Sequence, residues 1–318
     1  MMGCTDRHQR YFMRRISRHA RLYSEMLTAD AVIHGDRQRL LGFDASESPL
    51  ALQLGGSDPE KLAQAAGIGA QWGYDEINLN VGCPSERVQS GSFGACLMQQ
   101  PELVAACVDS MREQVDVPVT VKCRIGVDEQ DPYQMLPAFI ETVVQAGCEI
   151  FIIHARKAIL AGLSPRENRE IPPLDYPLVQ AMKAAYPQLT IVINGGIQSL
   201  AETEVHLDTV DGVMIGRAAY ANPWMLADAD TRLFGTQGDV PCPYRLVEQM
   251  YDYIEQELTR GTPLLTVIKP MIPLFQGVPG ARAWRRHLSE QAHRPGADLR
   301  IVEQALSFVS GNSALAAA

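Results

Sequence analysis

Several features of common protein classes are missing from this sequence of 318 residues. No apolar run approaches the roughly 18 residues that a membrane-spanning helix needs, and the basic N-terminus lacks the apolar segment of a signal peptide. The seven cysteines form no C-x-x-C pair, and their odd number argues against a disulfide framework and a structural zinc site. We therefore expect a protein of the reducing cytoplasm with no membrane segment and no bound metal.

Excess positive charge is missing as well. The net charge is −9, so the molecule as a whole does not attract nucleic acid, and any such binding must use local patches. Hydrophobic residues make up 46% of the chain, which is ordinary for a globular protein. The length fits one large α/β domain or a large domain with a small companion.

Short apolar runs alternate with longer amphipathic stretches along most of the chain. Helical stretches include residues 59–72, 101–115 and 133–146, and the strand candidates are residues 22–27, 50–54, 76–81, 117–125, 149–154, 190–194 and 212–215. Seven strands alternating with helices, with an eighth nearly missing at the start, predict a (β/α)8 TIM barrel whose first strand is truncated. A doubly wound sheet is the alternative, but no G-x-G-x-x-G motif follows the first strand.

The pattern changes near residue 234. Residues 234–243 have the composition of a turn-rich linker, and the four helical stretches that follow have no strands between them: 244–258, 264–274, 281–292 and 299–310. We expect a barrel domain over residues 1–233 and a small all-helical domain over residues 244–312. Another helix is expected over residues 7–21, with its arginines on an outer charged face.

Cys83 directly follows the predicted strand 76–81, where Gly82 and Pro84 break the strand. In parallel α/β proteins ligands gather at the carboxyl ends of strands, so a thiol at this position can meet a substrate. A lone cysteine is more often a small buried hydrophobic residue, so its neighbours have to decide between the two interpretations.

Polar residues recur at the ends of the other predicted strands. Asn194, Gly195 and Gly196 end one strand, and Gly216 and Arg217 end the next. Taken alone, Asn-Gly-Gly is more often a tight turn. Two glycine-containing strand ends in succession are typical of phosphate binding in barrels, because glycine lets backbone N–H groups approach an anion closely.

Gln53, Lys122 and His154 also lie at or near strand ends. An unpaired ammonium within an apolar strand costs several kcal/mol, so Lys122 requires either an electron-rich partner or an escape to solvent. A single histidine is usually satisfied within the core. Together with the glycine turns, this set fits flavin mononucleotide (FMN), with Gln and Lys donating to the ring and the turns holding the phosphate.

Longer motifs resemble those of the tRNA-dihydrouridine synthases. The resemblance covers nearly the whole chain and is carried by residues 79–85, 153–158 and Gly195-Gly196. Residues 5–8, 163–176 and 280–286 are similar to the A-type bacterial branch of that family. The resemblance implies a barrel that holds FMN, followed by a helical tRNA-binding domain.

The resemblance also implies roles for individual residues. NADPH is the expected reductant, hydride reaches C6 of a flipped-out D-loop uracil (the 20/20a type), and Cys83 protonates C5. Asn80 is expected to bind the uracil edge, and the loop 89–94 to close over it. Met1 and Met2 are expected beside the flavin, whereas the tRNA-contacting positions correspond to Arg166, Arg169, Arg282 and Arg285.

The chain departs from the family pattern at three places. In the family, the first strand ends in an Ala-Pro-Met motif, and this chain begins at the methionine of that motif. Cys4 stands where the family has a tryptophan, and Lys269-Pro270 stands where it has an Arg-His pair. Two alternatives stay open: an FMN barrel that reduces a small free pyrimidine, and a catalytically inactive RNA-binding relative. No protein partner is indicated.

Overall fold

The structure is a computed structural model that describes residues 1–85, 88, 91–236 and 241–310. Two compact units are distinguished by their internal packing. The first comprises Met1–Gly3 and Arg21–Gly216, and the second comprises Cys4–Ala20 and the chain from Arg217 onward.

The first unit is built on one sheet of seven parallel strands that pair in sequence order. The strands are β1 (Leu22–Thr28), β2 (Leu50–Gly55), β3 (Glu76–Val81), β4 (Val119–Arg124), β5 (Ile150–His154), β6 (Thr190–Asn194) and β7 (Gly212–Met214). The order never reverses, as it would at the switch point of a doubly wound sheet. The predicted (β/α)8 barrel architecture is therefore confirmed, and each strand end lies within two residues of its expected position.

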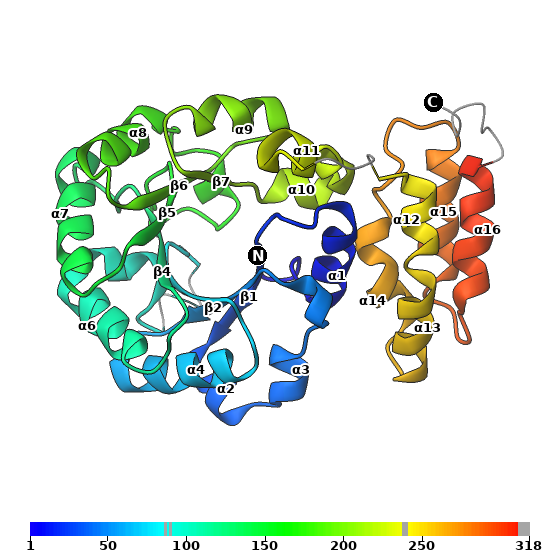
Figure 1. The fold of residues 1–318 in the computed structure, drawn as a ribbon, viewed down its shortest axis with the longest axis horizontal. Coiled ribbons are helices and arrows are strands. Elements are labelled where there is room, and N and C mark those ends of the chain that lie inside the picture. Colours follow the sequence, from blue (N-terminus) through cyan, green and yellow to red (C-terminus); the bar gives the residue numbers. More distant parts are fainter. Residues whose placement is uncertain (86–87, 89–90, 237–240, 311–318) are drawn as a thin grey trace. The chain divides into compact units, whose positions relative to one another are not determined.

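Helices cover the outer face of the curled sheet (Figure 1). They are α2 (Ala29–His34), α3 (Arg37–Leu41), α4 (Pro59–Gln71), α6 (Pro101–Arg112), α7 (Pro132–Gln145), α8 (Tyr176–Ala185) and α9 (Leu200–Leu207), with 3-10 turns η1 (Ala45–Glu47), η2 (Gly94–Gln99) and η3 (Glu167–Arg169). Asp58, Asp131, Asp175 and Ser199 accept backbone N–H groups at the starts of α4, α7, α8 and α9. Such caps satisfy N–H groups that have no partner within the helix.

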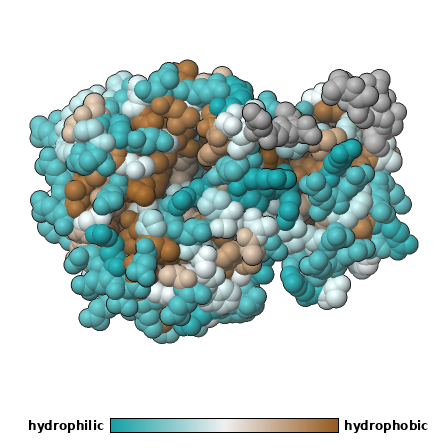
Figure 2. Space-filling view, viewed as in Figure 1, coloured by the Kyte–Doolittle hydropathy of each residue, from teal (hydrophilic) through white to brown (hydrophobic). Residues whose placement is uncertain are grey.

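Strand β3 shows how the strands divide their side chains between two environments. All of its residues are buried, and Ile77, Leu79 and Val81 belong to the hydrophobic core. The alternate residues Glu76 and Asn78 are hydrogen-bonded to polar side chains of the neighbouring strands. Hydrophobic residues gather over the strand region of this unit, whereas its rim is mostly hydrophilic (Figure 2).

The N-terminal residues of the first unit lie beside both outermost strands of the sheet. The Gly3 N–H donates to Glu25 Oε1 on β1. A Cβ atom built on Gly216, just after β7, would lie 3.4 Å from Met1 Sδ. Met1–Gly3 therefore occupies the interval between β1 and the end of β7.

The regular elements described in the second unit are all helical. They are α1 (Arg7–Ile16), α10 (Arg217–Ala221), α11 (Ala229–Phe234), α12 (Pro243–Glu248), α13 (Tyr251–Thr259), α14 (Leu264–Ile268), α15 (Ala281–Gln291) and α16 (Leu299–Ser310), with 3-10 turns η4 (Pro223–Leu226) and η5 (Lys269–Met271). Helix α14 ends just before Pro270, which lacks the N–H that would continue it. None of the helices in the described ranges is long and apolar enough to cross a membrane.

Helix α1 differs from its prediction in length and in the environment of its arginines. It ends at Ile16 because Asp230 Oδ1 and Oδ2 hold the extended chain beyond it, through Ser17 Oγ at 2.5 Å and the next backbone N–H at 2.7 Å. Arg10 and Arg14 are only 4% and 5% exposed, so the prediction of an outer charged face was wrong for these two arginines. Helix α1 packs against α14, η4 and η5, and the Arg14 guanidinium donates to carbonyls beyond the helix end.

The compact units do not divide at the predicted linker. They divide between Gly216 and Arg217, and the second unit includes α1. Within the linker 234–243, residues 237–240 lie outside the described part, as do residues 311 and 312 of the expected helical domain. The functional domains 1–233 and 244–312 therefore stay a prediction.

Two glycines near the start of α15 allow a direct test of helix packing in the second unit. Gly277 and Gly280 both have positive φ angles, but a Cβ atom finds open space at Gly277 and the Phe308 carbonyl oxygen of α16 at Gly280. We expect Gly277→Ala to lower the free energy of unfolding by about 1 kcal/mol through backbone strain alone. Gly280→Ala should cost at least about 2 kcal/mol more through the clash. Urea unfolding measures both, and equal losses would contradict the packing described.

Candidate active site

Cys83 lies just beyond the carboxyl end of β3 and is half-buried. All seven cysteines of the chain carry free thiols. In the first unit, Cys107, Cys123 and Cys148 are buried, and burial raises the pKa of each of these thiols to about 12. Cys83 is therefore the thiol that combines partial exposure with a position at a strand end.

The backbone of Cys83 is held from two sides. Asn80 Oδ1 accepts the N–H groups of Gly82 and Cys83 at 3.1 and 3.0 Å. The Cys83 carbonyl accepts the N–H of Ala95 at 2.9 Å, and Gly94 permits this approach because a Cβ there would lie 2.5 Å from the same oxygen. Of the predicted closing loop 89–94, residues 89 and 90 lie outside the described part.

Gln53, Asn78 and Asn80 form a buried cluster of side-chain amides. Gln53 on β2 is paired in register with Asn78 on β3. Gln53 Nε2 donates to Asn78 Oδ1 at 2.8 Å, and Asn80 Nδ2 donates to Gln53 Oε1 at 2.9 Å. The structure thus brings together three residues that the sequence singled out: Gln53, Asn80 and, through its backbone, Cys83.

The amide cluster continues to a buried carboxylate. Asn78 Nδ2 donates to Thr120 Oγ1 at 2.7 Å, and this hydroxyl donates to Glu76 Oε1 at 2.7 Å. Glu76 forms an ion pair with Arg21 at 2.5 Å and accepts the Tyr23 hydroxyl at 2.9 Å. Burial, followed by the charge of Glu76, raises the pKa of Tyr23 well above its ordinary value, so Tyr23 stays a neutral donor.

Lys122 lies beside Asn80 in the register of β3 and β4. Its ammonium donates to Asn194 Oδ1 at 3.2 Å, and Asn194 Nδ2 donates to the Met214 carbonyl at 2.7 Å. Burial lowers the pKa of Lys122 to about 8. Within the described residues no carboxylate forms an ion pair with this lysine, so the site keeps an uncompensated positive charge.

His154 packs directly against the glycine turn after β6. A Cβ on Gly195 would lie 2.5 Å from His154 Cδ2, so a side chain there would displace the imidazole. Gly195 and Gly196 have φ angles of 118° and 74°, which other residues rarely adopt. The Tyr176 hydroxyl donates to the Gly195 carbonyl at 2.6 Å and fixes the turn.

Arg124, at the end of β4, joins three segments and was not predicted as a site residue. Its guanidinium donates to the carbonyls of Gly82, Lys157 and Asn168 at 3.1, 2.9 and 2.8 Å. Burial, together with the charges of Arg169 and Arg156, lowers the pKa of Arg124 to about 10. It remains a cation and adds a second positive charge close to Lys122, whose pKa it helps to lower.

The remaining predicted cofactor residues lie at the ends of the sheet. Gly216 lies next to Met1, as described above, and the neighbouring Met2 is 54% exposed. Arg217 begins helix α10 in the second unit, so its placement relative to the barrel residues is not described.

The four predicted tRNA-contacting arginines fall into two pairs. Arg166 and Arg169 lie at η3 in the first unit, where Arg166 is exposed and makes a long 3.7 Å ion pair with Glu170. Arg282 and Arg285 are exposed and lie three residues apart on α15 in the second unit. Residues at this spacing share one side of a helix.

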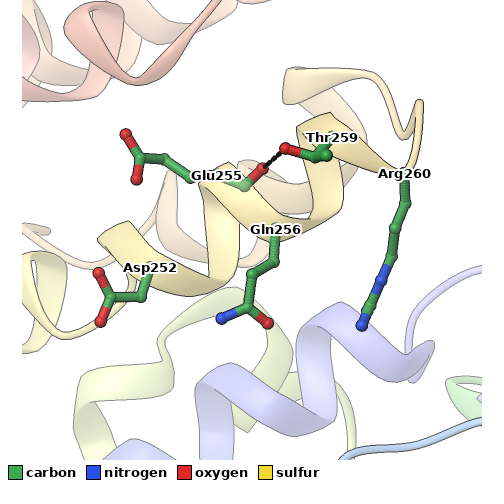
Figure 3. Close-up of a pocket in the computed structure, with 5 residues that line it drawn as sticks. All are labelled: Asp252, Glu255, Gln256, Thr259 and Arg260. Atoms are coloured by element: carbon green, nitrogen blue, oxygen red, sulfur yellow. Dashed lines mark hydrogen bonds between the residues drawn. The ribbon is translucent and has the colours of Figure 1, made fainter.

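A separate shallow pocket of about 400 Å3 lies on α13 in the second unit (Figure 3). Five residues line it: Asp252, Glu255, Gln256, Thr259 and Arg260. None of them is a predicted site residue, and two carboxylates are unsuited to an anionic ligand. The candidate active site is therefore not this pocket. It is the group of side chains at the carboxyl ends of the strands, which we call the strand-end cluster: Gln53, Asn80, Cys83, Lys122, His154 and Asn194.

Sequence reasoning missed Glu76, Asn78 and Thr120, although the signal was present. Glu76, Asn78 and Asn80 alternate along β3, and alternate residues of a strand face the same side. The alternation identified the strand, but only Asn80 was assigned to the site. Three polar residues on one face of a strand that is buried throughout required polar partners inside the barrel.

The parallel barrel and the polar side chains at its strand ends are typical of α/β-barrel proteins, which place their ligand sites at this end of the sheet. The particular family follows from comparison with known proteins. The chain belongs to the dihydrouridine synthase (Dus) family, whose pattern it matches over residues 1–310.

Relatives with curated names extend this result. The chain is 57% identical over 311 residues to the tRNA-dihydrouridine(20/20a) synthase of Shigella flexneri, covering 98% of this chain and 91% of that protein. It is 56% identical over 310 residues to the enzyme of the same name from Vibrio cholerae, covering 97% and 94%.

The lowered pKa of Lys122 leads to a prediction for the ligand-free protein. The folded value of about 8 lies below the ordinary 10.5. Between these values Lys122 binds more protons in the unfolded chain than in the folded one, so its contribution to the free energy of unfolding should rise as the pH increases from about 8 to 10.5. The three buried cysteines, whose pKa values are raised to about 12, contribute in the opposite sense at the upper end of this window, so the effect of Lys122 is measured as the difference between the wild type and a Lys122 variant. Lys122→Met should lose this contribution, so the free energy of unfolding of the wild type minus that of the variant, measured by urea unfolding, should increase across the window.

Lys61 provides the control for this experiment. It is exposed, and its hydrogen bond to Asp30 raises its pKa. Lys61→Met should therefore keep the rise that Lys122 causes. A difference between the wild type and Lys122→Met that stays constant across the window would contradict the assignment.

Proposed function

We propose that this chain reduces uridine to dihydrouridine in the D-loop of tRNA, at positions 20 and 20a. The proposal rests on membership of the dihydrouridine synthase family. It also rests on similarity, over almost the whole chain, to relatives named tRNA-dihydrouridine(20/20a) synthase. The observation that carries it is the strand-end cluster, in which Cys83 stands next to the donors Asn80, Gln53 and Lys122.

The donor set fits FMN as the cofactor. An isoalloxazine ring presents carbonyl oxygens and ring nitrogens, which accept hydrogen bonds from Gln53 and Lys122. His154 and Asn194 are further proposed FMN-binding residues, and Asn194 accepts a hydrogen bond from Lys122. The proposed contacts to the phosphate and to the remaining edge of FMN come from Gly195, Gly196, Gly216 and Arg217, together with Met1 and Met2. When bound, the flavin supplies the hydride, with NADPH as the reductant.

Cys83 is the proposed general acid. Saturating the C5–C6 bond of uracil adds a hydride to C6 and a proton to C5, and the thiol supplies that proton. Asn80 fixes the Cys83 backbone and offers an N–H to the base edge. The uracil has to leave its stack to reach the strand ends, which suits a site lined by donors and cations.

The proposed tRNA contacts come from Arg166, Arg169, Arg282 and Arg285. Their guanidinium groups can bind phosphates in a bidentate manner. Such local contacts overcome the overall charge of −9. A cytoplasmic location is part of the proposal and agrees with the free thiols.

The central test uses purified protein with FMN, NADPH and unmodified tRNA, with dihydrouridine measured by mass spectrometry of the nucleosides. We expect the wild-type chain to form dihydrouridine at the D-loop. Cys83→Ala should lose at least about a hundredfold in rate, as expected for a missing general acid, while flavin absorbance is retained.

Cys96→Ala is the matched control. Cys96 is also half-buried, but its thiol donates to the Phe93 carbonyl and burial raises its pKa. This variant should keep the wild-type rate. Absence of product with the wild-type chain would refute the function, and a normal rate in Cys83→Ala would refute the role of that thiol.

Replacing both Arg282 and Arg285 with Ala tests the tRNA contacts. Each lost phosphate contact should reduce the slope of log affinity against log salt by about 0.7 to 0.9. Arg300→Ala is the control, because Arg300 is engaged by Asp298 at 2.6 Å. Filter binding of tRNA across salt concentrations measures the slope, and an unchanged slope in the double variant would show that these arginines do not contact phosphate.

A further inference from the structure

Six groups inside the barrel form one continuous series of hydrogen bonds. In order, each donating to the next, they are the Cys83 N–H, the side chains of Asn80, Gln53, Asn78 and Thr120, and the Glu76 carboxylate. The donor-acceptor distances run from 2.7 to 3.0 Å. We refer to this series as the amide relay.

The two ends of the relay fix its direction. The N–H groups of Gly82 and Cys83 can only donate, so Asn80 must turn its oxygen toward them. The Glu76 carboxylate, paired with Arg21, can only accept, so the Thr120 hydroxyl must donate to it. Reversing any amide between them would place two donors or two acceptors against each other.

The fixed direction determines what the site can offer a ligand. The oxygen of Asn80 accepts the N–H groups of Gly82 and Cys83, and the oxygen of Gln53 accepts one N–H of Asn80. Each of these side chains has two amide protons and gives one to the relay, so one proton of each remains for a ligand. Next to them, Lys122 offers further N–H groups.

We propose that Asn78, Thr120 and Glu76 are positioning residues that hold Gln53 and Asn80 as hydrogen-bond donors. The ligand they select presents acceptors, namely carbonyl oxygens or unprotonated ring nitrogens. This selection rests on the proposed function where it concerns the flavin and the uracil. For the uracil, a donor fixed at Asn80 favours a ring carbonyl over the exocyclic amino group of cytosine.

Burial prevents the side chains of the relay from exchanging their hydrogen-bond partners for water. Asn78 and Thr120 are fully buried, and Glu76 is 2% exposed, so water does not offer these groups alternative partners. An unsatisfied buried amide is costly, which couples each orientation to the next. The hydroxyl of Thr120 is therefore the link through which the carboxylate holds Asn78 and, through Asn78, the amide nitrogen of Gln53. Asn80 holds the oxygen of Gln53 from the other end of the relay.

The test compares three variants of the full-length chain. Thr120→Val removes the hydroxyl and keeps the side-chain shape, whereas Thr120→Ser keeps the hydroxyl. Tyr23→Phe removes the other hydroxyl that donates to Glu76 Oε1 without interrupting the relay. Two measurements are made on each: the dissociation constant for FMN from flavin fluorescence, and the side-chain amide NMR signals of Gln53 in flavin-free protein.

We expect Thr120→Val to bind FMN about tenfold more weakly, as for the loss of one oriented hydrogen bond, and to show a second set of Gln53 amide signals. Thr120→Ser and Tyr23→Phe should bind FMN as the wild type does and show one set. If Thr120→Val does not fold, Thr120→Ala, which only removes atoms, is judged by the same criteria.

The outcomes separate this proposal from the proposed function. Wild-type FMN affinity and a single set of Gln53 signals in the hydroxyl-free variant would overturn the relay. Equal weakening in Tyr23→Phe would also overturn it, because the effect would then follow the stability of Glu76 and not the direction of the relay. Wild-type protein that forms no dihydrouridine would refute the function alone, since the NMR comparison needs no turnover.

Discussion

The Glu76 carboxylate can only accept hydrogen bonds, and it lies where water does not reach. Arg21 and Tyr23 satisfy it from one side, and Thr120 satisfies it from β4. The side chains of Thr120, Asn78, Gln53 and Asn80, which connect Glu76 to the strand ends, then each have one permitted orientation. The position of the Cys83 backbone is thus tied to a charge near the opposite ends of the strands.

The same interior is poor in free acceptors and rich in cations. Lys122 and Arg124 are satisfied by an amide oxygen and by backbone carbonyls, and no carboxylate within the described residues neutralises them. A ligand that enters such a site must supply electron-rich atoms. The local positive charge of these two side chains contrasts with the net charge of −9 of the whole chain.

Much of the barrel could be predicted from the sequence, because strand periodicity and helix caps are local signals. The residues 76–81, for example, alternate in the way that the structure uses. The arginines of α1 could not be placed, because their burial depends on α14 and η5, which come more than two hundred residues later. Arg124 was missed for a similar reason, since its partners are backbone carbonyls that leave no trace in the sequence.

The backbone carbonyls that bind Arg124 determine how this part of the site responds to pH. Peptide carbonyls do not ionise, and a guanidinium whose pKa is about 10 stays charged throughout the neutral range. The hydrogen bonds from Arg124 to the segments at Gly82, Lys157 and Asn168 therefore do not depend on pH in the neutral range. Changes in proton concentration can alter the charge of the neighbouring Lys122 while the frame that surrounds it keeps its shape.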